Sequence, residues 1–354
     1  MQRVITITSG KGGTGKTGIS LNLALELGRM GYRVCLFDAD LGLANLNILT
    51  GLTPQYTIES LIEKEKQLSD IIIKDYEGID IIPGSTGVEK LADLSARQAK
   101  ELIESFTGLS DYDYFLFDTS AGISEQVLSF CTSAREVIVV VTGEPTSLTD
   151  AYSLLKVLAR KRHAWPVDIV VNNIKDYATA RKAFEKLKTT ADRFLPIKIR
   201  PLGAVLHDRC VETAVISQVP FTVLFPQCRA AEGVHSIATR MVSKPPEQTG
   251  PVIRKFWQYL IRSFSGKRMN GREVSVHKGA GRELEKRENP EYKDRVEEKI
   301  AGLKKEVAEL KTRIEAMERH KSAKPPAERG VAPVEVILDF EKWAAEHKTR
   351  TAEH

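Results

Sequence analysis

The stretch Ser9-Gly10-Lys11-Gly12-Gly13-Thr14-Gly15-Lys16-Thr17 decides the fold of this chain. Its spacing matches the Walker A phosphate-binding loop, and it lies between an apolar run at residues 3–8 and a helical pattern at residues 18–30. In such a strand–loop–helix unit, backbone N–H groups and the N-terminus of the helix bind phosphate oxygens. The sequence therefore predicts a nucleotide site formed by Gly10, Lys11, Gly12, Gly13, Thr14, Gly15, Lys16, Thr17 and Gly18.

Three side chains of this loop have different expected roles. Lys16 is expected to reach the β- and γ-phosphates, and the hydroxyl of Thr17 is expected to bind Mg²⁺. Lys11 is an additional lysine that ordinary nucleotide hydrolysis does not require.

Apolar runs with the length of buried strands recur along the chain, and helical patterns lie between most of them. This alternation predicts a doubly wound α/β fold with a mostly parallel sheet, whose ligand binds at the carboxyl ends of the strands. Asp38, Asp118 and Asn172 each follow the apolar part of such a run, so we expect them to meet the glycine loop at one edge of the sheet. The runs lie at residues 3–8, 33–37, 79–83, 114–117, 137–142, 169–171 and 202–206.

Two aspartates are candidates for the metal site. Asp118 ends an apolar run in the manner of a Walker B element, and carboxylate oxygens are suitable ligands for Mg²⁺. Asp40 is expected to position an attacking water and, with Thr17 and Asp118, to complete the metal site. The alternative role is a helix N-cap for Asp118 and a turn residue for Asp40.

Length and charge indicate an α/β core with a basic extension. The chain has 354 residues, of which 42% are hydrophobic, and a formal net charge of +5. Most of the positive excess lies within residues 254–287, which favours a partner with an acidic surface, either a membrane or a nucleic acid.

The cysteines indicate a reduced, cytoplasmic protein. Cys35, Cys131, Cys210 and Cys228 are widely spaced and include no C-x-x-C pair, which argues against an iron–sulfur cluster or a zinc site. No secretory signal opens the sequence, and no apolar run approaches the ~18 residues that span a bilayer. Membrane contact is therefore expected to be peripheral, at the inner face of the cell membrane.

A change of composition predicts the domain boundaries. We expect an ATPase domain over residues 1–243, a Pro-rich linker over 244–251, an amphipathic helix over 252–268 and a charged tail over 269–354.

Four motifs, in this order, resemble those of the MinD/ParA ATPases, which carry a deviant Walker A loop. Among these proteins the sequence is most similar to the flagellar-number regulators called FlhG or FleN, over roughly residues 1–264. The motifs are Lys11-Gly12-Gly13-Thr14-Gly15-Lys16-Thr17, Asp38-Ala39-Asp40-Leu41-Gly42-Leu43-Ala44-Asn45-Leu46, Asp118-Thr119-Ser120-Ala121-Gly122-Ile123 and Glu144-Pro145-Thr146-Ser147-Leu148-Thr149-Asp150-Ala151-Tyr152.

The resemblance implies a specific mechanism that uses ATP and Mg²⁺. Lys11 would reach across an ATP-dependent homodimer to the partner's nucleotide, so that Lys11, Lys16 and Asp40 form the catalytic set. Asn172 would face the adenine, although a single Asn after a strand is as often a turn residue. The implied switch residues are Asp38, Asp40, Asp118, Gly122 and Asp150, with Asp150 as the resting partner of Lys11.

The segment at 252–264 has an apolar and a basic face when it is drawn as a helix. Large apolar residues opposite Arg254 and Lys255 are typical of a helix that lies among anionic headgroups. The alternative is a helix that packs against its own domain. The expected membrane residues are Val252, Ile253, Phe256, Trp257, Leu260, Ile261 and Phe264.

Two further segments follow in the tail. Residues 291–320 carry a heptad pattern of about three repeats, which favours a short parallel coiled coil. An intramolecular amphipathic helix is the alternative. Residues 334–343 form an apolar–polar segment that is either a docking element or part of a disordered tail.

The leading functional hypothesis is a slow, partner-stimulated ATPase that acts as a spatial switch and regulates flagellar number or placement. Its expected partners are a second copy of the chain, an anionic membrane and an unidentified protein, whereas nucleic acid is not expected. The chain begins at the first strand, without the N-terminal extension typical of FlhG, so stimulation of the flagellar GTPase FlhF is in doubt. The alternatives are a Min-type division-site regulator, a ParA-type cargo positioner and, from another class, a nucleotide-dependent binding switch without hydrolysis.

Overall fold

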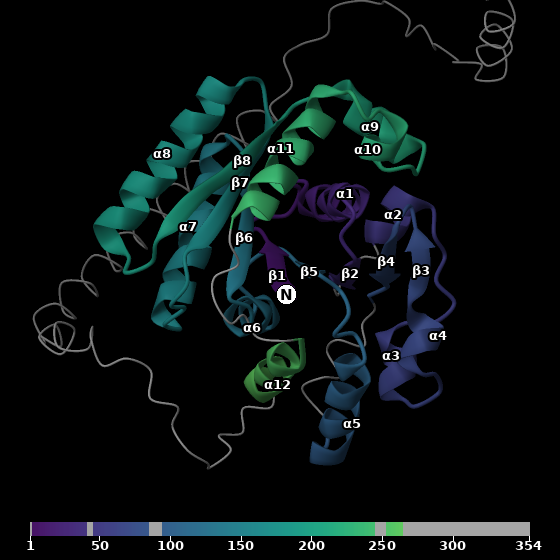
Figure 1. Ribbon diagram of the computed structural model, residues 1–354. Helices are drawn as coiled ribbons and strands as arrows, with labels where there is room; N and C mark the ends of the chain where they lie inside the picture. The colour runs from purple at the N-terminus through teal and green to yellow at the C-terminus, as the bar shows by residue number, and fades with distance from the viewer. Residues whose placement is uncertain (1, 41–44, 85–93, 245–252, 265–354) are drawn as a thin grey trace, which may run out of the picture. The chain divides into compact units, whose positions relative to one another are not determined.

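The computed structural model describes residues 2–40, 45–84, 94–244 and 253–264 (Figure 1). The predicted coiled coil at 291–320 and the docking segment at 334–343 lie outside these residues, as do Val252 and the linker from residue 245.

An eight-stranded sheet with the order β3-β4-β2-β5-β1-β6-β7-β8 forms the centre of the described part. Every neighbouring pair is parallel except β3 and β4, which are antiparallel. The doubly wound fold is therefore confirmed. The strands are β1 (Arg3–Thr8), β2 (Val34–Ala39), β3 (Ile73–Tyr76), β4 (Ile79–Ile82), β5 (Tyr114–Thr119), β6 (Glu136–Val141), β7 (Val167–Ile174) and β8 (Ile199–Leu206).

Helices cover both faces of the sheet (Figure 1). One apolar cluster unites α1, α10 and α11 with one face, and a second unites α5, α6, α7, α8 and α12 with the other. The helices are α1 (Lys16–Arg29), α2 (Asn45–Thr50), α3 (Ile58–Ile62), α4 (Leu68–Ile71), α5 (Ala96–Thr107), α6 (Glu125–Ser133), α7 (Pro145–Arg160), α8 (Tyr177–Phe194), α9 (Arg209–Ile216), α10 (Phe221–Leu224), α11 (Arg229–Ser243) and α12 (Ile253–Phe264).

Strand β5 contacts both layers because its side chains alternate between the two faces. Phe115 and Phe117 belong to the cluster that contains α12, whereas Leu116 belongs to the cluster on the side of α1. Asp118 also faces α1, where it contacts Lys16 and Ser20. Two consecutive residues, Phe117 and Asp118, thus connect β5 to opposite layers.

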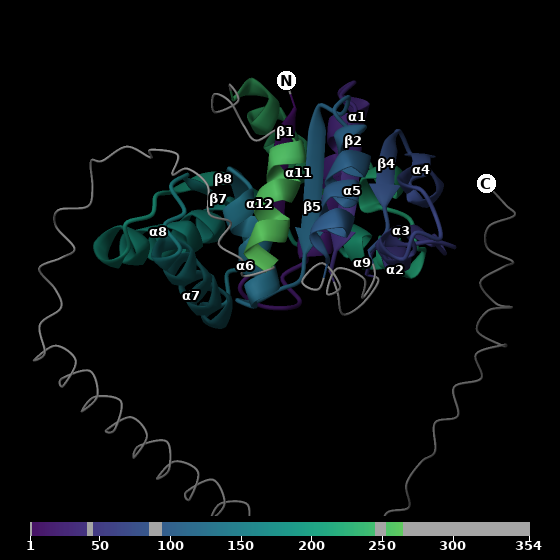
Figure 2. The same ribbon diagram turned by 90° about the horizontal axis from the view of Figure 1, so that it is seen from below.

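Helix α12 packs against the domain instead of presenting its apolar face to solvent. It lies beside α5 and α6 on the sheet face opposite α1 and α11 (Figures 1 and 2). Its ring contacts are close: Phe256 stacks on Phe117 with the centroids 4.3 Å apart, and Trp257 stacks on Phe106 at 4.0 Å. Complete burial of such side chains typically stabilises a fold by about 1.5–3 kcal/mol each.

Helix α12 belongs to the same compact unit as the sheet, and the linker expected at 244–251 stays a prediction. Five of the expected membrane residues are buried in the domain core: Ile253, Phe256, Trp257, Leu260 and Ile261. Phe264 is partly buried against the same cluster. The apolar periodicity was compatible with either a membrane or a protein neighbour, and in this structure the neighbour is protein.

Candidate nucleotide site

The glycine loop borders a cavity of about 630 Å³ at the carboxyl ends of the strands. Residues from several distant parts of the chain line it, which places the predicted loop, Asp40 and Asn172 around one space. The opposite wall comes from the end of β8 and from α9, including His207, Asp208 and Val211. Residues 207–212, which contribute to this wall, carry no motif that marks them in the sequence.

At two positions of the loop, neighbouring atoms lie too close to the backbone to leave room for a side chain. Gly15 has a left-handed φ of 81°, and a Cβ there would lie 2.3 Å from the Nδ2 atom of Asn172. A Cβ on Gly10 would lie 2.3 Å from the backbone carbonyl carbon of Asp150. Neither position accommodates a side chain without displacement of its neighbours.

Lys16 forms a buried ion pair with Asp118 at the start of α1. Its Nζ atom lies 2.8 Å from Asp118 Oδ1, which also accepts a hydrogen bond from Ser20 Oγ at 2.8 Å. The Asp118 side chain is fully buried and that of Lys16 is 7% exposed. Ser20 therefore orients the predicted Walker B carboxylate. It was missed in the sequence because a serine one turn after the loop has no distinctive spacing.

Three carboxylates converge near Lys16. Asp40 Oδ2 lies 4.0 Å from Lys16 Nζ, and Asp40 Oδ1 accepts a hydrogen bond from Ser120 Oγ. Asp38 Oδ1 accepts from the backbone N–H of Asp40. Burial, followed by the negative charge of Asp118, raises the pKa of Asp38 to about 8. A cation bound among these groups would relieve this repulsion.

The segment after β5 is attached directly to the loop. Gly122 has a φ of 104°, and its backbone N–H donates to the carbonyl oxygen of Ser9 at 2.8 Å. Ser9 in turn donates through Oγ to the carbonyl oxygen of Lys11. The predicted switch position Gly122 therefore contacts the residue that precedes the phosphate loop.

The Lys11 side chain contacts the N-terminal turn of α7. Its Nζ atom lies 3.3 Å from Glu144 Oε2 and donates to Thr146 Oγ1 at 3.0 Å. The expected partner Asp150 is thus corrected to Glu144. Asp150 lies one turn further along α7, and it is its backbone that approaches the loop, at Gly10.

Asn172 lies inside β7 and contacts the loop. Its Nδ2 atom donates to the carbonyl oxygen of Thr14 at 2.9 Å. Asn172 also lines the cavity beside the glycine loop. Its role toward the adenine stays a prediction.

The residues present fit a nucleotide with a divalent cation. Asp118 Oδ2 and Thr14 Oγ1 are buried polar atoms that find no hydrogen-bond partner among the described residues. Buried polar atoms without partners are costly, so both point to a ligand that supplies the missing contacts. A Cβ on Gly12, Gly13 or Gly18 would meet only open space, which leaves room for phosphate groups.

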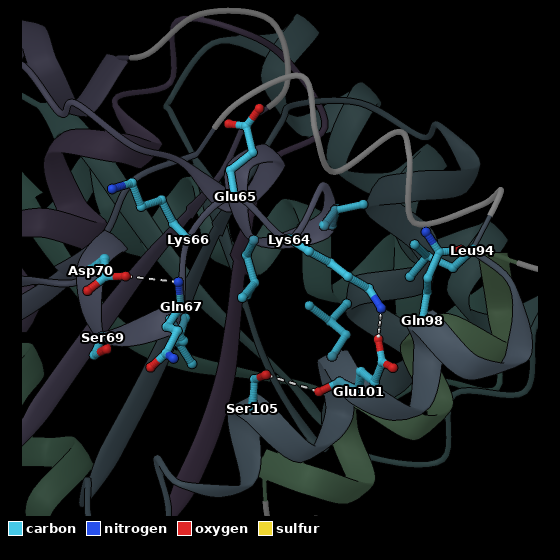
Figure 3. A pocket seen from close by; sticks show the side chains of 14 residues that line it. Lys64, Glu65, Lys66, Gln67, Ser69, Asp70, Leu94, Gln98, Glu101 and Ser105 are labelled. Atoms are coloured by element: carbon cyan, nitrogen blue, oxygen red, sulfur yellow. Dashed lines mark hydrogen bonds and ion pairs between the residues drawn. The ribbon is translucent and has the colours of Figure 1, made fainter.

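A second cavity, of about 840 Å³, lies away from this site between α3, α4 and α5 (Figure 3). The Lys64–Glu101 ion pair crosses it with a separation of 2.6 Å between the charged atoms. Its lining is mostly polar and contains none of the residues predicted for nucleotide binding, so it does not belong to the nucleotide site.

Comparison with known proteins agrees with this geometry. A family model described as an AAA domain matches residues 2–169. The antiactivator FleN of Pseudomonas aeruginosa is 40% identical over 244 residues, which cover 69% of this chain and 87% of FleN. The flagellum site-determining protein YlxH of Helicobacter pylori is 32% identical over 268 residues, which cover 73% and 90%.

A solved structure shows the same fold with a ligand. The septum site-determining protein MinD of Pyrococcus horikoshii, complexed with Mg-ADP, superposes with a TM-score of 0.56 and 27% identity over 69% of this chain and 97% of that protein. Proteins of this kind bind ATP with Mg²⁺. The chain belongs to the MinD/ParA family of P-loop ATPases, together with FleN.

Proposed function

We propose that this chain hydrolyses ATP as a homodimer, binds membrane reversibly and controls the number or placement of flagella. The observation that carries the proposal is that the two lysines of the loop differ in burial and in ion-pair partner. Lys16 is buried and paired with Asp118, whereas Lys11 is 41% exposed and paired with Glu144.

The buried groups suit ATP binding within one subunit. Lys16 and the loop N–H groups would hold the phosphates, and Thr17, Asp118 and Asp40 would hold Mg²⁺. The cation would neutralise charge on the phosphate oxygens. Asp40, which accepts a hydrogen bond from Ser120, would orient the attacking water.

The exposure of Lys11 would allow it to contact a second subunit. Its ion pair with Glu144 is open to solvent, and exposed pairs contribute only about 0–1 kcal/mol. Lys11 can therefore exchange this partner at low cost for the phosphates of a facing subunit, where a cation stabilises the transition state.

Substitution of Lys11 tests this proposal. Lys11→Ala should retain nucleotide affinity but lose dimerisation with a non-hydrolysable ATP analogue, as measured by light scattering. ATP turnover should fall by roughly a thousandfold or more, as when an arginine finger is removed. Lys188→Ala is the matched control, because Lys188 is similarly exposed and paired with Asp192 on α8. A Lys11→Ala protein that dimerises like the control would contradict the proposal.

The flagellar role is supported by the names of the two relatives, FleN and YlxH. Capture with the Asp40→Ala protein held in the ATP state distinguishes the alternatives. Recovery of flagellar basal-body proteins would support the flagellar role, whereas recovery of MinC-like proteins would replace it with placement of the division site.

Membrane binding through α12 requires the helix to leave its position in the core. The basic side chains Arg254, Lys255 and Arg262 are exposed, but the apolar face is covered by α5, α6 and β5. No helix among the described residues is long and apolar enough to cross a bilayer. The contact between Phe256 and Phe117 adjoins Asp118, so a nucleotide-linked movement of β5 would act directly on the position of α12.

Two serines allow the helix to be locked in place. Ser129 Oγ in α6 lies 2.8 Å from Ser263 Oγ in α12, so cysteines at both positions would be within reach of a disulfide. The Ser129→Cys/Ser263→Cys protein should sediment with anionic liposomes and ATP only after reduction. The Ser263→Cys single variant should bind with ATP under both conditions and more weakly with ADP. Equal binding of the oxidised and reduced double variant would show that α12 does not need to be released.

A further inference from the structure

Two cysteines that are distant in the sequence meet beside the nucleotide cavity. Cys210 lies in the first turn of α9, and Cys228 immediately precedes α11. Their Sγ atoms and a carboxylate oxygen of Asp208 all lie within 4.8 Å of one another. We propose that Asp208, Cys210 and Cys228 form a zinc site that joins the starts of α9 and α11.

The donor set fits zinc. Thiolate sulfur and carboxylate oxygen are both zinc ligands, and a zinc ion held by three protein ligands takes water in its fourth position, as catalytic zinc sites do. Tetrahedral zinc with Zn–S bonds of about 2.3 Å holds its sulfurs roughly 3.8 Å apart. Small side-chain rotations are therefore sufficient, and all three residues are partly exposed, so the ion has access.

The carboxylate is already oriented by the backbone. Asp208 Oδ1 accepts from the N–H of Cys210, and Oδ2 accepts from the N–H of Arg229, each at 3.0 Å. Each oxygen keeps a further lone pair for a metal. Such fixed outer contacts are typical of metal ligands.

The surrounding charge suits the filled site. Two thiolates, one carboxylate and Zn²⁺ carry a net charge of −1. The N-termini of α9 and α11 meet here, and their partial positive charge favours an anionic group. The guanidinium of Arg229 adds to the same field.

The proposed zinc site borders the nucleotide cavity, so a bound ion would affect the wall of that cavity. Asp208, Val211 and Glu212 line the same cavity as the phosphate loop. An ion that ties α9 to α11 would fix this wall without contacting the phosphates. The expectation of no zinc site followed from the absence of C-x-x-C spacing, which detects only ligands that are close in sequence.

Cobalt binding tests the site in the full-length, reduced protein without nucleotide. One equivalent of Co²⁺ should give the sulfur-to-cobalt charge-transfer absorption of thiolate ligation, and Zn²⁺ should abolish it. Cys210→Ala and Cys228→Ala should each lose this absorption. Cys131→Ala is the control, because Cys131 is a core cysteine outside the cluster, and it should keep the absorption.

Absence of the absorption in the parent protein would overturn the proposal, as would its retention in both cluster variants. A Cys210–Cys228 disulfide that persists in the presence of reductant, seen as a mass lower by two hydrogens, would also overturn it. Circular dichroism of each variant confirms that loss of absorption is not loss of fold.

Discussion

The buried ion pair between Lys16 and Asp118 is the interaction on which the site depends. Both side chains are nearly inaccessible, and a buried charge is tolerated only when a partner and further hydrogen bonds compensate it. Ser20 supplies one such bond, and the free Asp118 Oδ2 atom leaves one coordination position open. The pair thus keeps the loop and β5 in contact while preserving a place for the cation.

Strand β5 connects this site to α12. Asp118 faces the nucleotide layer, and its neighbour Phe117 stacks on Phe256 in the opposite layer. Because close-packed cores transmit small displacements, a change at the carboxylate reaches the aromatic cluster within one residue. Helix α12 is therefore packed one residue away from the predicted nucleotide site, on the opposite face of the sheet.

The sheet and the phosphate site could be predicted from the sequence because both are encoded locally. Apolar runs marked seven of the eight strands, whereas β3 was missed: Ile-Lys-Asp-Tyr is short, half polar and lies at an edge. Contacts between segments that are distant in the sequence could not be predicted from such local patterns. The choice of Glu144 over Asp150, the contact of Ser20 and the meeting of Cys210 with Cys228 all depend on how distant segments pack. The apolar face of α12 could be predicted from the sequence, but what it packs against could not. Apolar side chains are equally favourable in a lipid bilayer and in a protein core.

We propose that catalysis requires two subunits, in which Lys16 would contact the nucleotide of its own subunit and Lys11 that of its partner. The most direct measurement is ATP turnover per subunit as a function of protein concentration, at saturating ATP and Mg²⁺. We expect turnover per subunit to rise with concentration and to reach a plateau when the dimer is fully formed. Turnover per subunit that stays constant across the range in which light scattering detects only monomer would contradict it.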